Sequence, residues 1–250
     1  MPDSSSPSRP ERTATVKAVF FDLDGTLYPT RSCYVDAARA VHGVLVAEAG
    51  CTQSPDEFVA EWNAIFRELE RETPDLPAIH DRCYRLMRYG ERHSVPLRLV
   101  ATLDDLYWTV YLNGITAYGD AAATFDALHA RGVSVGVGTN MSTHWQLRKL
   151  ERCGLVDKVD FLVTSEIAGA EKPSAAFFGH CLRKAGVAPE NCLFVGDNPV
   201  ADIQGATDAG IRALWLVNSE TIASKPAFAQ QETPPNATRI ASLSEVLDHL

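Results

Sequence analysis

The chain has 250 residues, enough for one large domain or for a domain with a sizeable insertion. Hydrophobic residues make up 46% and charged residues 22%, as in ordinary globular proteins, which argues against a disordered or fibrous chain. The net charge is −9 at neutral pH, so a nucleic acid polymer would be repelled at long range and is not expected as a partner.

The N-terminal residues and the cysteines bear on the compartment. Residues 1–14 are rich in Ser, Pro and charged residues and lack the apolar core of a secretory signal, so we expect a disordered leader. No run approaches the roughly 18 apolar residues of a membrane span, and no membrane partner is expected. The six cysteines form no C-x-x-C pair, which favours reduced thiols over a zinc cluster or a disulfide framework. We therefore expect a cytoplasmic protein.

The first predicted element is a short apolar run at residues 16–21 that leads into acidic residues and Gly25. This pattern is typical of a buried strand that runs into a loop. The carboxyl end of that strand is Asp22.

Between residues 31 and 116 helix signals replace strand signals. Ser54 can cap a helix that begins at Pro55, and Glu57 can reach back to complete a capping box. Apolar residues then follow at spacings of three and four, as along one helix face: Phe58, Trp62, Ile65, Phe66 and Leu69. Four helices are expected in this segment, with helix ends at Gly50, Gly90 and Gly114.

From residue 117 onward the sequence repeats one pattern, in which a helical segment ends at a Gly and an apolar strand-like run follows. The glycines are Gly132, Gly154, Gly186 and Gly210. The predicted strands are 133–138, 161–164, 192–196 and 211–217, which are apolar on both faces, as in strands covered by helices on both sides. Residues 219–238 are predicted to form a surface loop, and 242–250 a short final helix.

These elements predict an α/β fold with a Rossmann-like parallel sheet and helices on both of its faces. The catalytic core would comprise residues 15–30 and 117–250. Residues 31–116 would form an inserted α-helical domain.

Four successive strand ends of this predicted sheet carry polar or charged residues. In an open parallel sheet these ends lie along the edge where ligands bind. Several carboxylates placed together require a cation or a shared proton. Each signal alone also fits an acidic turn, a helix N-cap or a solvated lysine, but their order together favours a functional site. The residues, in chain order, are Asp22 and Asp24, Thr139 and Asn140, Lys172, and Asp197 and Asp202.

The same segments resemble the four motifs of the haloacid dehalogenase-like hydrolase superfamily. The matching segments are FDLDGTLYP (21–29), GTN (138–140), EKP (171–173) and GDNPVAD (196–202). The helical insertion directly after the first motif resembles the cap of the branch whose cap lies between motifs one and two. We identify the chain as a member of the phosphatase branch, because the dehalogenase branch lacks an acid at the position of Asp24.

The resemblance implies a division of labour among the motif residues. Asp22 would be the nucleophile that forms an aspartyl-phosphate, and Asp24 the general acid and base. Lys172 would place a positive charge beside Asp22 and the phosphoryl oxygens. Thr139 and the backbone N–H of Asn140 would hold those oxygens in line.

The resemblance also implies a bound Mg²⁺, which would screen the carboxylates from the phosphate. Its ligands would be a carboxylate oxygen of Asp22, the backbone carbonyl of Asp24 and the carboxylate of Asp197. Asp202 would stand behind these ligands or act through water.

The expected substrate is a small phosphorylated metabolite. Residues 138–173 and 202–216 resemble nucleotidases and acylneuraminate phosphatases of the superfamily, so a nucleoside monophosphate or a sugar phosphate is preferred. The inserted domain contains nine arginines and no lysine, and these arginines would either hold a second anionic group or form surface ion pairs. They are Arg31, Arg39, Arg67, Arg71, Arg82, Arg85, Arg88, Arg92 and Arg98.

Two alternatives remain open at this point. A sugar-phosphate mutase would use the same aspartyl-phosphate and return the phosphoryl group to a sugar hydroxyl. A non-catalytic binding or regulatory protein would keep the fold without the reaction, because fold alone does not imply function.

Overall fold

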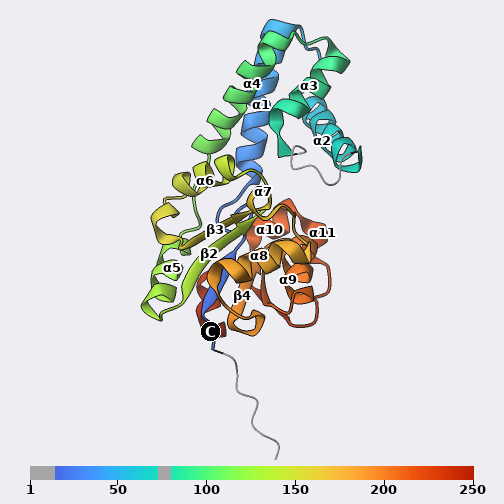
Figure 1. Cartoon of the computed structure of the whole chain (residues 1–250). Helices are drawn as coiled ribbons and strands as arrows, with labels where there is room; N and C mark the ends of the chain where they lie inside the picture. The colour runs from blue at the N-terminus through green and yellow to red at the C-terminus, as the bar shows by residue number, and fades with distance from the viewer. Residues whose placement is uncertain (1–14, 73–79) are drawn as a thin grey trace, which may run out of the picture.

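The structure is a computed structural model that describes residues 15–72 and 80–250. The expected leader, residues 1–14, lies outside the described residues. One parallel sheet of six strands forms the centre of the lower part of the molecule, in the order β3-β2-β1-β4-β5-β6 (Figure 1). The strands are β1 (Ala18–Phe21), β2 (Ser134–Thr139), β3 (Phe161–Thr164), β4 (Cys192–Gly196), β5 (Arg212–Leu216) and β6 (Ala237–Ile240).

The predicted α/β fold with a parallel sheet is confirmed, and five of these strands coincide with predicted ones. The surface loop expected at 219–238 is wrong, because this segment forms α10 (Ser219–Ser224) and α11 (Pro226–Ala229) and enters β6. Only Ile240 of β6 is fully buried, so the strand has no apolar pattern to reveal it. Pairing with β5 defines it instead. The final predicted helix is a 3-10 helix at Ser244–His249.

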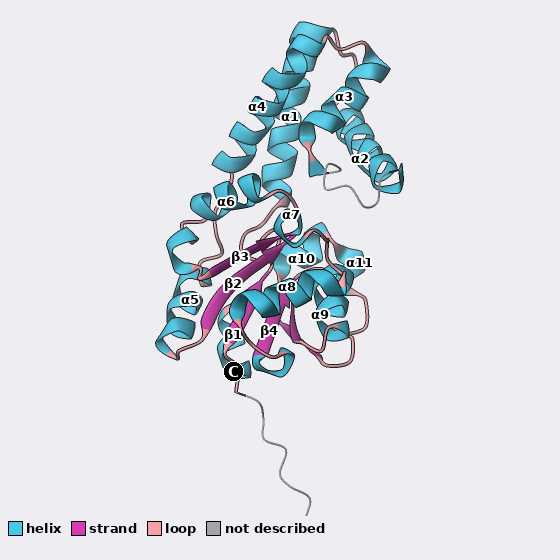
Figure 2. Ribbon diagram, viewed as in Figure 1, coloured by secondary structure: helices cyan, strands magenta, loops and turns pink. Residues whose placement is uncertain are grey.

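Helices cover both faces of the sheet (Figure 2). On one face α5 (Ala121–Ala130) and α6 (Thr143–Arg152) pack on alternate strand residues, and the rings of Phe21 and Phe125 lie 4.9 Å apart. On the other face α8 (Ala175–Ala185) and α9 (Gly205–Asp208) pack, and the rings of Phe178 and Phe194 lie 5.1 Å apart. The sheet is thereby buried on both sides, as its apolar strands predict.

Among the described residues between β1 and α5 there are four helices, the number predicted, and we call them the insertion helices. They are α1 (Arg31–Ala49), α2 (Pro55–Glu72), α3 (Arg82–His93) and α4 (Leu97–Asn113). The capping box is present, because the Ser54 N–H donates to Glu57 Oε2 at 2.7 Å and the Glu57 N–H donates to Ser54 Oγ at 3.3 Å. No helix in the described ranges has the length and apolar character needed to cross a membrane.

Two of the three expected helix ends in this segment are confirmed. Gly50 ends α1 in the left-handed conformation, and Gly114 follows α4. Gly90 was expected to end α3, which is wrong, because the helix continues to His93 and Ser94 adopts the left-handed turn with a φ of 55°. Gly90 is buried inside α3, and Val95 is its near neighbour.

We call the sheet together with the helices that cover its faces the sheet domain. The insertion helices contact it through an aromatic pair. Trp108 of α4 and Trp145 of α6 are stacked, with ring centroids 3.9 Å apart and planes inclined by 12°. The chain returns from the insertion nearby, where the Tyr118 N–H donates to the Leu27 carbonyl at 2.9 Å. These contacts join α4 to α6, and the end of the insertion to the loop after β1.

Candidate active site

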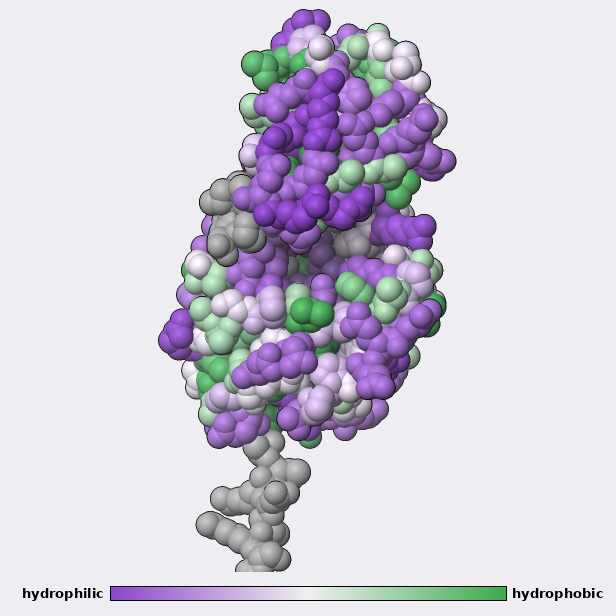
Figure 3. All heavy atoms as spheres, turned by 90° about the vertical axis from the view of Figure 1, so that its right-hand side faces the viewer, coloured by the Kyte–Doolittle hydropathy of each residue, from purple (hydrophilic) through white to green (hydrophobic). Residues whose placement is uncertain are grey.

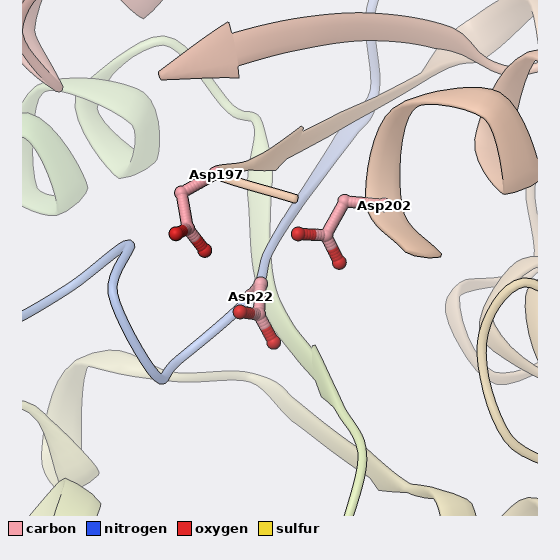
Figure 4. A group of neighbouring side chains, drawn as sticks. All are labelled: Asp22, Asp197 and Asp202. Atoms are coloured by element: carbon pink, nitrogen blue, oxygen red, sulfur yellow. The ribbon is translucent and has the colours of Figure 1, made fainter. Parts of the chain in front are cut away.

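Three carboxylates converge at the carboxyl edge of the sheet (Figure 4). Asp22 follows β1, Asp197 follows β4, and Asp202 lies on the helical turn Pro199–Gln204. Each offers an oxygen, and these oxygens all lie within 4.8 Å of one another. The residues are only 6%, 2% and 1% exposed, respectively. Three buried acids at this spacing are unstable as bare anions and call for positive charge.

Lys172 supplies part of that charge. Its Nζ donates to Asp22 Oδ1 and Asp202 Oδ1, each at 2.6 Å, and to the Gly138 carbonyl at 3.1 Å. Its backbone N–H donates to Asn140 Oδ1 at 2.9 Å. The side chain of Asn140 therefore joins the loop after β2 to the loop of Lys172 and fixes the position of the ammonium group.

Lys225 supplies the rest, from the junction of α10 and α11. Its Nζ donates to Asp197 Oδ2 at 2.6 Å. Burial raises the pKa of Asp22 to about 6 and raises that of Asp197, and the lysine beside each carboxyl only partly opposes the rise. Burial likewise raises the pKa of Asp202.

Three acids against two lysines leave a surplus of negative charge on oxygen ligands. Asp22, Asp197 and Asp202 therefore fit a hard divalent cation such as Mg²⁺, which prefers carboxylate oxygens.

Asp24 has a different environment. Lys149 Nζ lies 2.9 Å from both of its carboxylate oxygens, Gln146 Nε2 donates to Oδ2 at 2.9 Å, and the Tyr28 hydroxyl donates to Oδ1. Burial alone would raise its pKa, but the Lys149 ammonium and these hydrogen bonds together hold the pKa of Asp24 well below its usual range. In this arrangement Asp24 is an anion at any physiological pH.

Residues at the end of β2 are hydrogen-bonded to Gln146, which also donates to Asp24. Gln146 is fully buried, and its Nε2 lies 2.6 Å from Thr139 Oγ1 and 2.7 Å from the Asn140 carbonyl. The structure thus brings Thr139 beside Asp24 through one shared amide. The side chain of Asn140 is occupied with the backbone of Lys172.

All seven residues selected from the sequence lie along this one edge. The sequence did not indicate Tyr28, Gln146, Lys149 and Lys225, nor Tyr111, whose hydroxyl lies 3.0 Å from the Tyr28 hydroxyl and donates to Asp24 Oδ1 at 3.4 Å. Gln146 and Lys149 had a usable signal, because they lie three residues apart on the helix directly after the GTN segment and so share a face. Lys225 had none, because its segment was predicted to be a loop.

A cleft with a volume of about 760 Å³ opens above the carboxylates. Figure 3 shows the molecule hollowed between the insertion helices and the sheet domain, with hydrophilic residues around the hollow. Asp22, Lys172 and Asp197 line it from below. From the insertion helices and the residues beside them it is lined by Arg31, Tyr34, Asn63, Phe66, His80, Arg82 and Tyr111, among others.

Comparison with known proteins agrees with this geometry. The family model described as haloacid dehalogenase-like hydrolase matches residues 16–210. A solved structure titled 2-haloacid dehalogenase, from Pseudomonas syringae, superposes with a TM-score of 0.69 at 28% identity, over 94% of this chain and 97% of that one.

Characterised relatives match over most of the chain. Ribulose-1,5-bisphosphate 5-phosphatase of Halopiger xanaduensis is 34% identical, over 92% of this chain and 98% of that protein. Glyceraldehyde 3-phosphate phosphatase of Methanothermobacter thermautotrophicus is 33% identical, over 82% and 87%. N-acylneuraminate-9-phosphatase of Rattus norvegicus is 26% identical, over 81% and 83%. The family predicted from the four motifs is confirmed: the chain belongs to the haloacid dehalogenase-like hydrolases, in their phosphatase branch.

Proposed function

We propose that this protein is a Mg²⁺-dependent phosphatase that releases phosphate from a small sugar phosphate through an aspartyl-phosphate on Asp22. The observation that carries the proposal is the buried Asp22 carboxylate at the floor of the cleft, 2.6 Å from Lys172 Nζ and grouped with Asp197 and Asp202. A carboxylate oxygen attacks phosphorus, the new O–P bond forms, and the bond to the leaving alkoxide breaks.

The residues around Asp22 prepare this step. Lys172 holds Asp22 in place and offers positive charge to the phosphoryl oxygens, and the Thr139 hydroxyl at the end of β2 offers them a hydrogen-bond donor. A bound Mg²⁺ would neutralise charge on the phosphoryl group, held by Asp22, Asp197 and the Asp24 carbonyl, with Asp202 behind them. The acid surplus described above supports this assignment.

Asp24 would serve as general acid and base. Its ionised form suits the second step, in which it takes a proton from the water that attacks the aspartyl-phosphate. For the first step it must carry a proton to the leaving oxygen, which Lys149 opposes in the present arrangement. We therefore propose that Asp24 exchanges Lys149 for the leaving-group oxygen when substrate is bound.

The insertion helices, within residues 31–116, would act as a cap that excludes water and contacts the rest of the substrate. Two of the relatives above are named for phosphorylated sugars, which supports a sugar phosphate rather than a nucleoside monophosphate as the substrate.

The test is phosphate release from a panel of sugar phosphates and nucleoside monophosphates, with Mg²⁺ and with a chelator. We expect release that needs Mg²⁺ and is concentrated on sugar phosphates. An excess of isomerised sugar phosphate over free phosphate would favour the mutase. A folded protein that releases no phosphate and forms no Mg²⁺-dependent beryllium fluoride complex would favour the binding protein.

We also propose a cytoplasmic location. All six cysteines are free in the structure. Burial raises the pKa of Cys181 and of Cys192 to about 12, which keeps both thiols protonated and unreactive. Free thiols suit a reducing compartment. Cell fractionation checks the proposal, and recovery in a secreted fraction would contradict it.

A further inference from the structure

The structure separates the nine arginines of the insertion into different kinds. Arg88 and Arg92 lie on the outer side of α3 and pair with Glu72 and Glu68 of α2, as surface arginines commonly do. Arg82 faces the cleft that also contains Asp22.

Arg82 is held by aromatic rings and has hydrogen-bonding capacity to spare. Its guanidinium carbon lies 5.3 Å from the centre of the Tyr107 ring and 5.5 Å from that of Trp108. One terminal N–H donates to the His80 carbonyl at 2.8 Å. Its Nε is buried and has no hydrogen-bond partner. The guanidinium group is thus fixed in place while one of its buried donors is unsatisfied.

The guanidinium group of Arg85 neighbours that of Arg82. Arg85 is only 2% exposed and lies over the Trp62 and Phe66 rings, at 4.9 and 4.6 Å. Burial and the neighbouring charge of Arg82 lower its pKa to about 10. It donates to the Tyr34 hydroxyl at 3.2 Å, and this hydroxyl lines the cleft.

Neither arginine forms an ion pair with a carboxylate of residues 15–72 or 80–250. Burial and neighbouring acids raise the pKa of Asp104 to about 6. They outweigh the electrostatic interaction with Arg82, which lowers the pKa of this carboxyl. Asp104 has an unpartnered buried oxygen of its own and forms no ion pair with Arg82. A buried cation beside a partly buried one, without an anion, is unfavourable unless a ligand brings the anion.

The position relative to the reaction site fits a small molecule. Lys149 Nζ, which contacts Asp24, lies 5.9 Å from the centre of the Trp108 ring, and the Arg82 guanidinium carbon lies 5.5 Å from the same centre. Both cations also line the same cleft. One short phosphorylated compound would therefore reach from the Asp24 side of the cleft to Arg82.

We propose that Arg82, supported by Arg85 and Tyr34, binds a second oxyanion of the substrate, at the end opposite to the phosphoryl group that Asp22 attacks. This inference rests on the proposed function and narrows it to small phosphate esters that carry another phosphate or a carboxylate. The planar donor fork of arginine matches either oxyanion.

Matched substrate pairs test the proposal. Ribulose 1,5-bisphosphate against ribulose 5-phosphate isolates a second phosphate, and 3-phosphoglycerate against glyceraldehyde 3-phosphate isolates a carboxylate. We expect kcat/KM to be about 10- to 100-fold higher for the member with two anionic groups in at least one pair, because a hydrogen-bonded charge contributes about that factor. The pair that shows the preference identifies the oxyanion.

Variants connect the preference to the residue. Arg82→Ala should reduce the ratio within the preferred pair to about one, and Arg82→Lys should keep part of it, because charge remains without the fork. Arg88→Ala, on the outer side of the same helix, is the control and should keep the full ratio. Thermal melting of each variant checks that it is folded.

Binding supplies a readout that does not need turnover. Calorimetry measures binding of the preferred compound with two anionic groups to Asp22→Asn and to the double variant Asp22→Asn/Arg82→Ala. The double variant should bind it about 10-fold or more weakly than Asp22→Asn does. A wild-type enzyme that is active on both members of each pair without preference would overturn this inference alone, as would an unchanged ratio or affinity after Arg82→Ala. Absence of phosphate release from every compound would instead contradict the proposed phosphatase activity, and the binding result would then decide the oxyanion site by itself.

Discussion

The cleft has two walls: the carboxyl edge of the sheet, which we call the sheet wall, and the insertion helices, which we call the insertion wall. The charged side chains of the two walls differ in their partners. On the sheet side, each of the four acids of the site contacts an ammonium group from the same chain: Asp22 and Asp202 contact Lys172, Asp24 contacts Lys149, and Asp197 contacts Lys225. On the insertion side, Arg82 and Arg85 contact aromatic rings and no described acid. Each acid of the reaction site thus contacts a cation before any ligand arrives, with one acid in excess, whereas the two guanidinium groups of the opposite wall have no described carboxylate partner.

The largest effect should come from Asp22→Asn. This change removes the proposed nucleophile from the sheet wall, and we expect phosphate release to fall by about 10⁴-fold or more. Because it also removes one of three crowded acids, the melting temperature in chelator should not decrease. Asp157→Asn on an exposed turn is the control. Turnover near the wild-type rate by Asp22→Asn would exclude Asp22 as the nucleophile.

Lys172→Met tests whether the contact of these acids with a cation is needed for the fold itself. It leaves Asp22 and Asp202 buried without their shared cation, and we expect a loss of about 3–5 kcal/mol in the free energy of unfolding, measured by urea denaturation in chelator. Mg²⁺ should restore part of it, because the ion binds only the folded site. Lys184→Met on the surface of α8 should change little. Equal stability of both variants would show that the acids are not charged together.

Lys149→Met should act mainly on the pH profile. Lys149 lowers the pKa of Asp24, so the ionised base persists to acidic pH in the wild type and is lost only as pH falls through that low value. Without Lys149, burial dominates and the pKa of Asp24 rises above its usual range, so that kcat at pH 5 relative to pH 8 should fall several-fold against the wild type. Lys158→Met, which breaks the exposed ion pair with Asp126, is the control. An unmoved acid limb would show that Asp24 is not the base.

The smallest effect should come from Asp104→Asn, on the insertion wall. The pKa of Asp104 is raised to about 6 in the folded protein, so its ionisation works against folding as pH rises through that value. The variant should therefore be more stable than the wild type at pH 8, by about 1 kcal/mol, and equally stable at pH 4. Asp36→Asn on α1 is the control. A variant less stable than the wild type at pH 8 would mean that Asp104 pairs with Arg82 after all.

Much of the sheet wall could be predicted from sequence because its signals are local. A buried strand that ends in Asp22, and glycines that end helices before apolar runs, are patterns of a few adjacent residues. The residues that complete the site come from elsewhere. Lys225 reaches Asp197 only because the chain folds α10 and α11 beside β5, a segment without strand or helix periodicity.

The insertion wall shows the same limit more strongly. Nine arginines look alike in sequence, and only the packing of α3 against α2 and α4 determines which of them meet a glutamate and which meet aromatic rings. The helix end predicted at Gly90 is wrong because a glycine is also tolerated inside a helix without ending it.

The stack of Trp108 on Trp145 gives the protein an optical reporter of its own conformation. Two indoles that lie nearly parallel at 3.9 Å couple their electronic transitions, and these two belong to α4 and α6. Any tilt of the insertion helices against the sheet domain would separate the rings and change their near-ultraviolet circular dichroism and fluorescence. Opening and closing of the cleft can therefore be followed in the unlabelled protein, during titration with substrate or Mg²⁺.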